Sequence, residues 1–267
     1  MRLFRRFKRT APQSDERSIN LAFVLLSTPQ LPDADEVIRS FASLATNGAA
    51  LRSRESDDRS GMEILLLEVD ADSDVMIALM PIPVPNREAD EAARFSVSTF
   101  GTGWTLPPHE AHLVVTLQSA KPALESLLTF TSVLAAIAEA SSAVGVYCGN
   151  AGATHDPNFF IDLAREGSVD TGIMLWNGVS LAQEPDGRVS LLSLGMKQLE
   201  LPDLWLIAPR ESEPLEWFFN LLCFIASEGE PIPDGDTIGR TEDEKIPVRY
   251  VPSPIDDTTK VARIEIN

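Results

Sequence analysis

The sequence predicts a mixed α+β fold, built on a mainly antiparallel sheet with helices packed on it. Three observations predict this class. Short apolar runs typical of buried strands alternate with segments of helical periodicity along the chain. Two of these runs are joined by DADSD, residues 70–74, which is typical of an antiparallel hairpin. Turns are frequent, because 19 of the 267 residues are Pro. A chain of this length holds one large domain or two small ones.

The first half of the body, residues 19–106, is predicted to be an α+β unit. LAFVLLS, residues 21–27, is an apolar run typical of a buried strand. A Pro-rich turn separates it from a segment with apolar residues at helical spacing, for which Asp33 is the expected N-cap. The other elements expected in this half are strands at 62–70 and 75–84, a short helix at 87–97 and a loop at 100–108.

The second half, residues 107–267, begins with the same order of elements. Aligning Leu21 with Ala111, an offset of 90, superposes a strand, a Pro-marked turn and an amphipathic helix. We therefore expect two similar strand–helix–strand halves joined in one compact unit. The second helix, residues 121–141, is so sparsely charged that it should be deeply buried. The later elements expected are strands at 145–148, 171–183, 188–195, 199–208, 245–253 and 260–266, and helices at 157–165 and 215–227.

The charge of the chain restricts its partners. The formal net charge is −18, and residues 19–267 carry 38 acidic against 16 basic side chains. An acidic body repels phosphate backbones, which argues against nucleic-acid binding and favours a basic protein partner. The basic start has no apolar run behind it, and no segment is long and apolar enough to span a membrane. We therefore expect a cytoplasmic protein.

Residues 1–18 are expected to form a basic flexible tail, with six Lys or Arg against two acids. At helical spacing, three apolar side chains near the start would share one face, surrounded by arginines. Such a segment could lie on an anionic membrane surface, and a disordered solubilising tail is the other interpretation. The residues of this amphipathic start are Arg2, Leu3, Phe4, Arg5, Arg6 and Phe7.

The segment GVYCGNAGATHDPNFF, residues 145–160, holds the side chains with the most chemistry. A catalytic cysteine needs a base within hydrogen-bond reach, and a Gly-rich loop could fold His155 back onto Cys148, next to Asp156. Asn150 could supply an orienting amide or a binding group. In the structural interpretation, the glycines permit a tight loop and the segment is mainly architecture.

No metal or cofactor site is expected. His109 and His112 are three residues apart where a strand begins, and an odd spacing in a strand places them on opposite faces. Asp234 and Asp236 resemble the start of a calcium loop, but Ile and Lys occupy the fifth and twelfth positions, where oxygen ligands are needed. The two aspartates therefore remain binding candidates only. The chain also lacks a Gly-rich phosphate loop and a Gly-x-Ser-x-Gly motif.

Four segments of the chain follow one another in an order typical of a known family. They are AHLVVTL (111–117), AVGVYCGNAGATHDPNFF (143–160), LGMKQLELPDL (194–204) and EGEPIPDGDTIG…EKIPVRYVPS (228–253). Over roughly residues 20–267 the chain resembles domain-of-unknown-function family 4261, a family of uncharacterised bacterial proteins. The resemblance implies a soluble intracellular protein and brings no assigned activity or catalytic residue. Relatives commonly carry Trp at the position of Cys148, which argues against a cysteine nucleophile.

These observations favour a non-enzymatic protein-binding module of the immunity, adaptor or chaperone type. The acidic body and the lack of a convincing catalytic motif both support this interpretation. One alternative is a hydrolase that uses Cys148 and His155, and another is a peripheral membrane protein that uses residues 1–9. Trp205 and Trp217 could mark a binding face, but both are expected within core elements.

Overall fold

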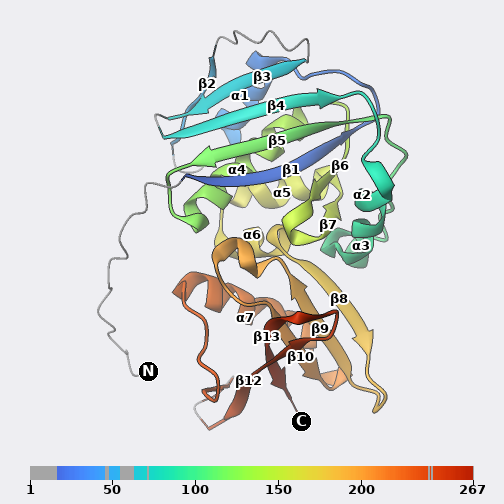
Figure 1. Ribbon diagram of the computed structural model, residues 1–267, viewed down its shortest axis with the longest axis vertical. Coiled ribbons are helices and arrows are strands. Elements are labelled where there is room, and N and C mark those ends of the chain that lie inside the picture. The colour runs from blue at the N-terminus through green and yellow to red at the C-terminus, as the bar shows by residue number, and fades with distance from the viewer. Residues whose placement is uncertain are drawn as a thin grey trace.

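Two β-sheets form the frame of the molecule. The computed structural model describes residues 17–45, 48–54, 63–70, 72–239, 241 and 243–266. Sheet A has the strand order β2-β3-β4-β5-β1-β6-β7, and sheet B has the order β11-β12-β13-β10-β9-β8. Among the residues described, all strand pairs are antiparallel except β10 with β13, so the predicted α+β class is confirmed. The two sheets lie one above the other along the long axis (Figure 1).

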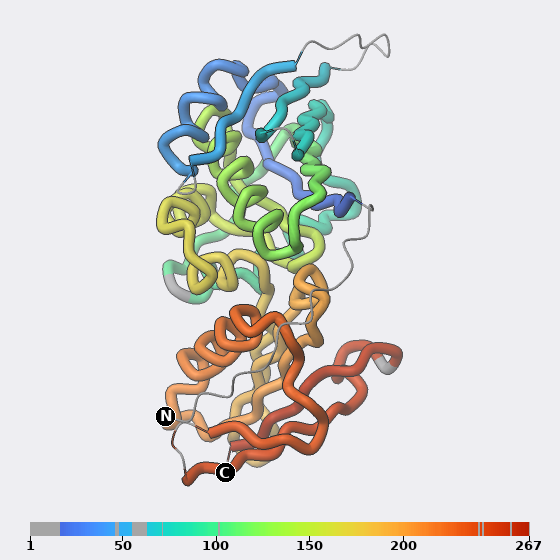
Figure 2. Tube along the Cα trace, turned by 90° about the vertical axis from the view of Figure 1, so that its left-hand side faces the viewer, coloured from blue at the N-terminus to red at the C-terminus, as the bar shows by residue number. Residues whose placement is uncertain are grey.

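Sheet A carries helices α1, α4 and α5 on one face, as the two perpendicular views show (Figures 1 and 2). Its 3₁₀ turns are Pro85–Arg87, Ala93–Phe95 and Gly149–Ala151. The elements of this part are β1 (Ser18–Leu26), α1 (Ala34–Leu44), β2 (Leu51–Arg54), β3 (Ile64–Val69), β4 (Ser73–Met80), α2 (Glu88–Ala92), α3 (Val97–Thr102), β5 (Ala111–Ser119), α4 (Ala123–Glu139), β6 (Ala143–Cys148), β7 (Ala153–His155) and α5 (Pro157–Glu166).

Sheet B carries α7 on one face, and α6 lies between the two sheets (Figure 1). Its 3₁₀ turns are Met196–Leu199 and Arg210–Ser212. Within the described residues, none of the helices combines the length and the apolar character needed to cross a membrane. The elements of this part are α6 (Val169–Trp176), β8 (Gly178–Gln183), β9 (Val189–Leu194), β10 (Leu204–Ala208), α7 (Pro214–Glu228), β11 (Thr237–Ile238), β12 (Ile246–Ser253) and β13 (Asp256–Glu265).

The two strand–helix units aligned in the sequence are neighbours in space. β1 and β5 pair antiparallel, with Leu26 opposite Ala111, and α1 packs against α4. The expected N-cap is present, since the Asp33 carboxylate accepts a hydrogen bond from the Glu36 amide at 3.1 Å. The division expected after residue 106 separates strands that pair with one another, because β1 and β4 both bond to β5. The transition from sheet A to sheet B comes at α6.

The strand predicted over 171–183 is wrong in its first half, where the chain forms α6. Ser168 caps this helix, and its hydroxyl accepts from the Thr171 amide at 3.2 Å. A Cβ at Gly172 would lie 2.4 Å from the Trp176 ring, so the missing side chain makes room for the indole. A short apolar run that is buried on all sides has no periodicity that separates helix from strand.

Other helix and strand boundaries also differ from those predicted. Residues 100–102 belong to α3 rather than to a loop, since Ser96 caps this helix. The strand expected from residue 199 starts only at Leu204, after a 3₁₀ turn. Strands β2 and β7 were not predicted, because four and three residues are too few to show an alternating pattern. The hairpin over 70–74 is confirmed, and β8 pairs antiparallel with β9 across residues 184–187.

The joint between the sheets is built by the segment LGMKQLELPDL, residues 194–204. The Asp203 carboxylate accepts hydrogen bonds from the Ser193 hydroxyl and from the amides of Gly195 and Met196, at 2.8 to 3.1 Å. Gly195 has φ 143°, and a Cβ there would lie 2.2 Å from the carbonyl oxygen of Trp176. Only glycine permits this approach, so the turn after β9 packs directly against the end of α6.

One apolar core runs through both sheets and the helices between them. A second, smaller cluster lies on the opposite face of sheet A, where Leu25, Val84 and Ala89 are buried together. The chain from residue 84 to 106 therefore folds over one end of that face.

Candidate functional site

The histidine of the 145–160 segment is part of the core. His155 is fully buried on β7. Its Nδ1 accepts a hydrogen bond from the Ser96 hydroxyl at 2.7 Å, and its Nε2 donates to the Leu175 carbonyl at 3.1 Å. Burial lowers the pKa of His155 from 6.5 to about 4, although the bond to Leu175 opposes this effect. Both ring nitrogens thus serve the fold, and neither bonds to Cys148.

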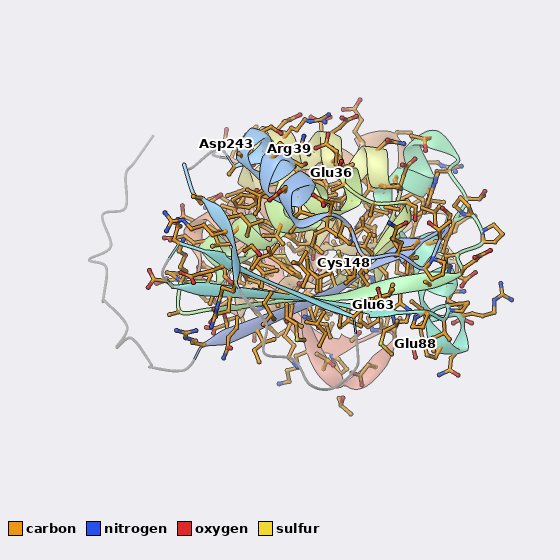
Figure 3. All side chains as sticks on the ribbon, turned by 90° about the horizontal axis from the view of Figure 1, so that it is seen from above. Glu36, Arg39, Glu63, Glu88, Cys148 and Asp243 are labelled. Carbon is orange, nitrogen blue, oxygen red and sulfur yellow. The ribbon has the colours of Figure 1, made fainter. Side chains whose placement is uncertain are left out.

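Cys148 ends β6 and its side chain packs against the main core. Figure 3 labels Cys148 near the centre of the molecule as seen from above. Burial raises the pKa of this thiol to about 12, so the thiolate needed for nucleophilic attack is scarce at neutral pH. The geometry does not supply the nucleophile–base contact that the hydrolase alternative requires.

We expect the thiols of the native protein to react slowly. Burial also raises the pKa of Cys223 to about 12, helped by the charge of Asp170. Alkylation of Cys148 by iodoacetamide at pH 8 should be at least about a hundredfold slower in the native than in the urea-unfolded protein, because the thiolate fraction falls with each pKa unit. Peptide mapping by mass spectrometry measures this ratio. Equal rates would show an accessible, activated thiol and would restore the hydrolase alternative.

The neighbouring candidates have separate roles. Asp156 caps α5, and its carboxylate accepts from the Asn158 amide at 2.8 Å. Asn150 instead lines a hollow of about 200 Å³ together with Tyr147 and Glu88. The 145–160 segment therefore distributes its polar groups between a helix cap, a core hydrogen bond and a surface hollow.

The other two histidines hold one segment of backbone. The His109 Nε2 accepts from the Val84 amide at 3.1 Å, and the His112 Nδ1 donates to the Ile82 carbonyl at 2.8 Å. Desolvation by burial lowers the pKa of both. In the part of the chain that the structure describes, no three His, Cys, Asp or Glu side chains gather as a metal site would need.

The segment 230–239 forms a fixed wall beside β12. The Asp234 carboxylate accepts from the Tyr250 amide at 3.0 Å, and the Tyr250 hydroxyl donates to the Ile232 carbonyl at 3.0 Å. Backbone bonds tie Gly235 and Asp236 to Val248. Of the two predicted binding aspartates, Asp234 thus has a structural bond, whereas Asp236 faces the groove described next.

A groove of about 610 Å³ lies between α7 and this wall. Its floor is apolar, and the side chain of Phe224 is 54% exposed above it. We call it the α7 groove. Its lining residues are Trp217, Asn220, Leu221, Phe224, Glu228, Glu230, Pro231, Ile232, Pro233, Asp236, Thr237, Ile238 and Gly239.

The α7 groove exists because α7 has two apolar faces. Phe218, Leu222 and Ile225 are buried in the core. Trp217 and Phe224 belong to a second face that lines the groove, at helical spacing with Leu221 and Glu228. Trp217 packs against the main core, where the sequence predicted it, and it also lines the groove, because the periodicity of a helix that is apolar on two sides does not say which side stays open.

The charge at the groove is acidic. Among the described lining residues there are three carboxylates, Glu228, Glu230 and Asp236, and no Lys or Arg. An apolar floor beside carboxylates binds groups that combine apolar surface with positive charge. The size of the groove is within the range of natural ligand sites, about 300–1,000 Å³.

Comparison with known proteins identifies the part of the chain that holds the groove. No curated protein and no solved structure matches the chain. Residues 192–265 match the family model described as "Domain of unknown function (DUF4261)", a stretch that contains the joint, the whole α7 groove and most of sheet B. The resemblance predicted from the sequence is confirmed for residues 192–265, which is the part of the chain that matches this family model.

Proposed function

We propose that this protein is a cytoplasmic, non-enzymatic protein-binding module whose α7 groove receives a segment of a partner protein. The observation that carries the proposal is the combination of an apolar floor, an exposed phenylalanine and three carboxylates in one groove. The segment it fits is amphipathic, with apolar residues that enter the groove and Lys or Arg residues beside them.

The apolar surface and the carboxylates of the groove have different energetic roles. Apolar burial contributes about 25 cal/mol per Å², so covering Phe224 and the floor supplies the affinity. Glu228, Glu230 and Asp236 supply selectivity and faster association, since charge complementarity steers encounter. The bonds of the 230–239 segment to β12 hold the groove in shape before binding, which reduces the entropy lost on association. An immunity, adaptor or chaperone role is compatible with such a site.

Selection of peptides tests the proposal. Random 12-residue peptides displayed on phage are selected on the immobilised full chain, and enriched sequences are synthesised for affinity measurement. We expect apolar residues alternating with Lys or Arg. Affinity should fall as salt rises, because the charges on both sides are exposed to solvent.

A pair of variants on one helix locates the binding. Phe224→Glu should weaken the selected peptides at least about tenfold, because it places a charge on the apolar floor. Leu215→Glu is the matched control, since Leu215 is an exposed apolar residue of α7 outside the groove. Peptides that bind both variants as well as the native chain, or a selection without any consensus, would contradict the proposed function.

A further inference from the structure

The hollow beside Asn150 has two aromatic walls. Phe23 on β1 lies directly opposite Tyr147 on β6, so both side chains project from the same face of sheet A. Their ring centroids are 5.7 Å apart, and the two ring planes are inclined at 60°. Both residues line the hollow of about 200 Å³, together with Glu88, Asn150 and the end of β1 at Leu21. We call this site the aromatic hollow.

The backbone holds Glu88 in place beside the two rings. Asn86 and Arg87 have left-handed backbone, with φ 56° and 59°, which is uncommon for residues other than glycine. They turn the chain into α2, which begins at Glu88 and packs beside β7 (Figure 1). The Thr154 hydroxyl on β7 donates to the carbonyl of the buried Ala89 at 2.7 Å. The start of α2 is therefore fixed against sheet A before any ligand binds.

The polar groups at the aromatic hollow are available to a ligand. Glu88 and Asn150 are exposed. Within the described part of the chain, the Glu88 carboxylate, the Asn150 amide and the Tyr147 hydroxyl have no hydrogen-bond or ion-pair partner. Burial raises the pKa of Tyr147, and the nearby charge of Glu88 raises it further. The hollow thus brings an unpaired carboxylate close to a neutral phenol ring.

This combination favours an organic cation as the ligand. The faces of aromatic rings attract a cation within about 6 Å of the ring centre, and the Glu88 carboxylate adds a full negative charge. A calcium or magnesium ion would need about six oxygen ligands, whereas the described lining holds one carboxylate. The same carboxylate repels phosphate groups. The hollow is smaller than the roughly 300–1,000 Å³ of sites that enclose drug-sized ligands, so it fits one chemical group.

We propose that the aromatic hollow binds a methylated ammonium group, either of a free quaternary amine or of a methylated lysine side chain. Phe23 and Tyr147 contact the methyl groups, and Glu88 compensates the positive charge. Methylation favours this site because an unmodified ammonium is strongly hydrated and loses more on leaving water. No residue of the aromatic hollow lines the α7 groove, so the site does not depend on the function proposed for that groove.

Nuclear magnetic resonance of the full chain tests the proposal, because the chain has two tyrosines, Tyr147 and Tyr250. With isotope-labelled tyrosine, the Tyr147 amide reports on the aromatic hollow. The Tyr250 amide donates to Asp234 and reports on the wall of the α7 groove. Choline is titrated at constant ionic strength. We expect the Tyr147 signal to shift with a dissociation constant of about 5 mM, while the Tyr250 signal stays in place.

Two further ligands define what the hollow recognises. Dimethylbutanol, in which a tert-butyl group replaces the trimethylammonium group of choline, has the same shape without the charge. It should bind at least about fivefold more weakly than choline. A short peptide with one trimethyllysine distinguishes the two sources of the cation. Tighter binding of the peptide than of choline assigns the hollow to a modified protein, and weaker binding assigns it to a free amine.

Variants of the lining locate the binding. Glu88→Gln should weaken choline at least about fivefold, because it removes the compensating charge. Glu91→Gln is the matched control, since Glu91 is an exposed residue of α2 outside the hollow and its loss changes the net charge equally. Phe23→Leu should weaken choline at least about fivefold, whereas Phe23→Tyr keeps the ring and should stay within about twofold. Circular dichroism verifies that the variants fold.

Four results would overturn the proposal. The first is a Tyr147 signal that does not move up to about 50 mM choline, ten times the expected constant. The second is equal affinity for choline and dimethylbutanol, and the third is a Glu88→Gln variant that binds choline as tightly as Glu91→Gln. The fourth is a shift of the Tyr250 signal alone, which would place the cation at the α7 groove. A failed peptide selection, in contrast, contradicts only the function proposed for that groove.

Discussion

Replacing Asp203 with alanine is expected to lower the free energy of unfolding by about 3 kcal/mol. Three donors, the Ser193 hydroxyl and the amides of Gly195 and Met196, bond to the same carboxylate oxygen. The substitution leaves them without this acceptor in the joint between the sheets, and an unsatisfied buried donor costs about 1–3 kcal/mol. Urea unfolding followed by tryptophan fluorescence and by circular dichroism measures the change, and agreement of the two signals checks cooperativity.

Asp203→Asn is the matched control for this experiment. Burial raises the pKa of Asp203 above its ordinary value, although its three hydrogen bonds oppose the shift. A neutral side chain of the same shape retains an acceptor oxygen, so we expect a loss of only about 1 kcal/mol. A similar loss in both variants would contradict the role given to the hydrogen bonds and would assign the joint to apolar packing alone.

The second large effect is a loss of stability in mild acid. The pKa of His155 is about 4 in the folded protein and 6.5 as its ordinary value, so the folded state binds fewer protons than the unfolded state. The contribution of neutral His155 is complete above pH 6.5 and is lost as the pH falls from 6.5 to 4. A difference of this size removes about 3 kcal/mol by pH 4, since each pKa unit corresponds to about 1.4 kcal/mol.

Unfolding curves collected between pH 4 and 7 measure this loss. His109 and His112 add to it in the same direction, because their pKa values are also lowered. Asp203 opposes it, because a carboxyl with a raised pKa gains stability as the pH falls. The control is His155→Gln, which is less stable throughout but should lose the His155 part of the slope between pH 6.5 and 4. An unchanged slope in this variant would contradict the assignment.

The order of helices and strands followed largely from local patterns. Asp33 marked the start of α1, the sparse charge of residues 121–141 predicted the burial of α4, and the hairpin over 70–74 followed from its turn. The errors fell where local patterns carry little information. The run from residue 171 to 176 is buried on all sides and became α6, and β7 is three residues long. Such segments take their structure from the contacts around them.

The candidate sites depended far more on the tertiary structure. Cys148, Asn150, His155 and Asp156 lie within nine positions of the sequence, yet each contacts a different part of the structure: the main core, a surface hollow, Ser96 and the start of α5, respectively. The α7 groove shows the opposite case: Trp217 and Asp236 are far apart in the sequence, yet both line the same groove. Closeness along the chain does not determine which way a side chain points, and burial is the largest cause of the shifted pKa values of Cys148 and His155.

By itself, the sequence determined the acidic charge, the α+β class, most of the strands and helices, and the family of residues 192–265, since each of these depends on composition, on local periodicity or on a recognisable order of segments. Only the tertiary structure decided that the chain divides into two sheets at α6, that α7 keeps one apolar face open, and that Leu21 and Met76 are exposed on the outward side of sheet A. The physical reason is that exposure is a property of neighbours, and the neighbours of Leu21 and Phe224 come from strands and loops far away along the chain.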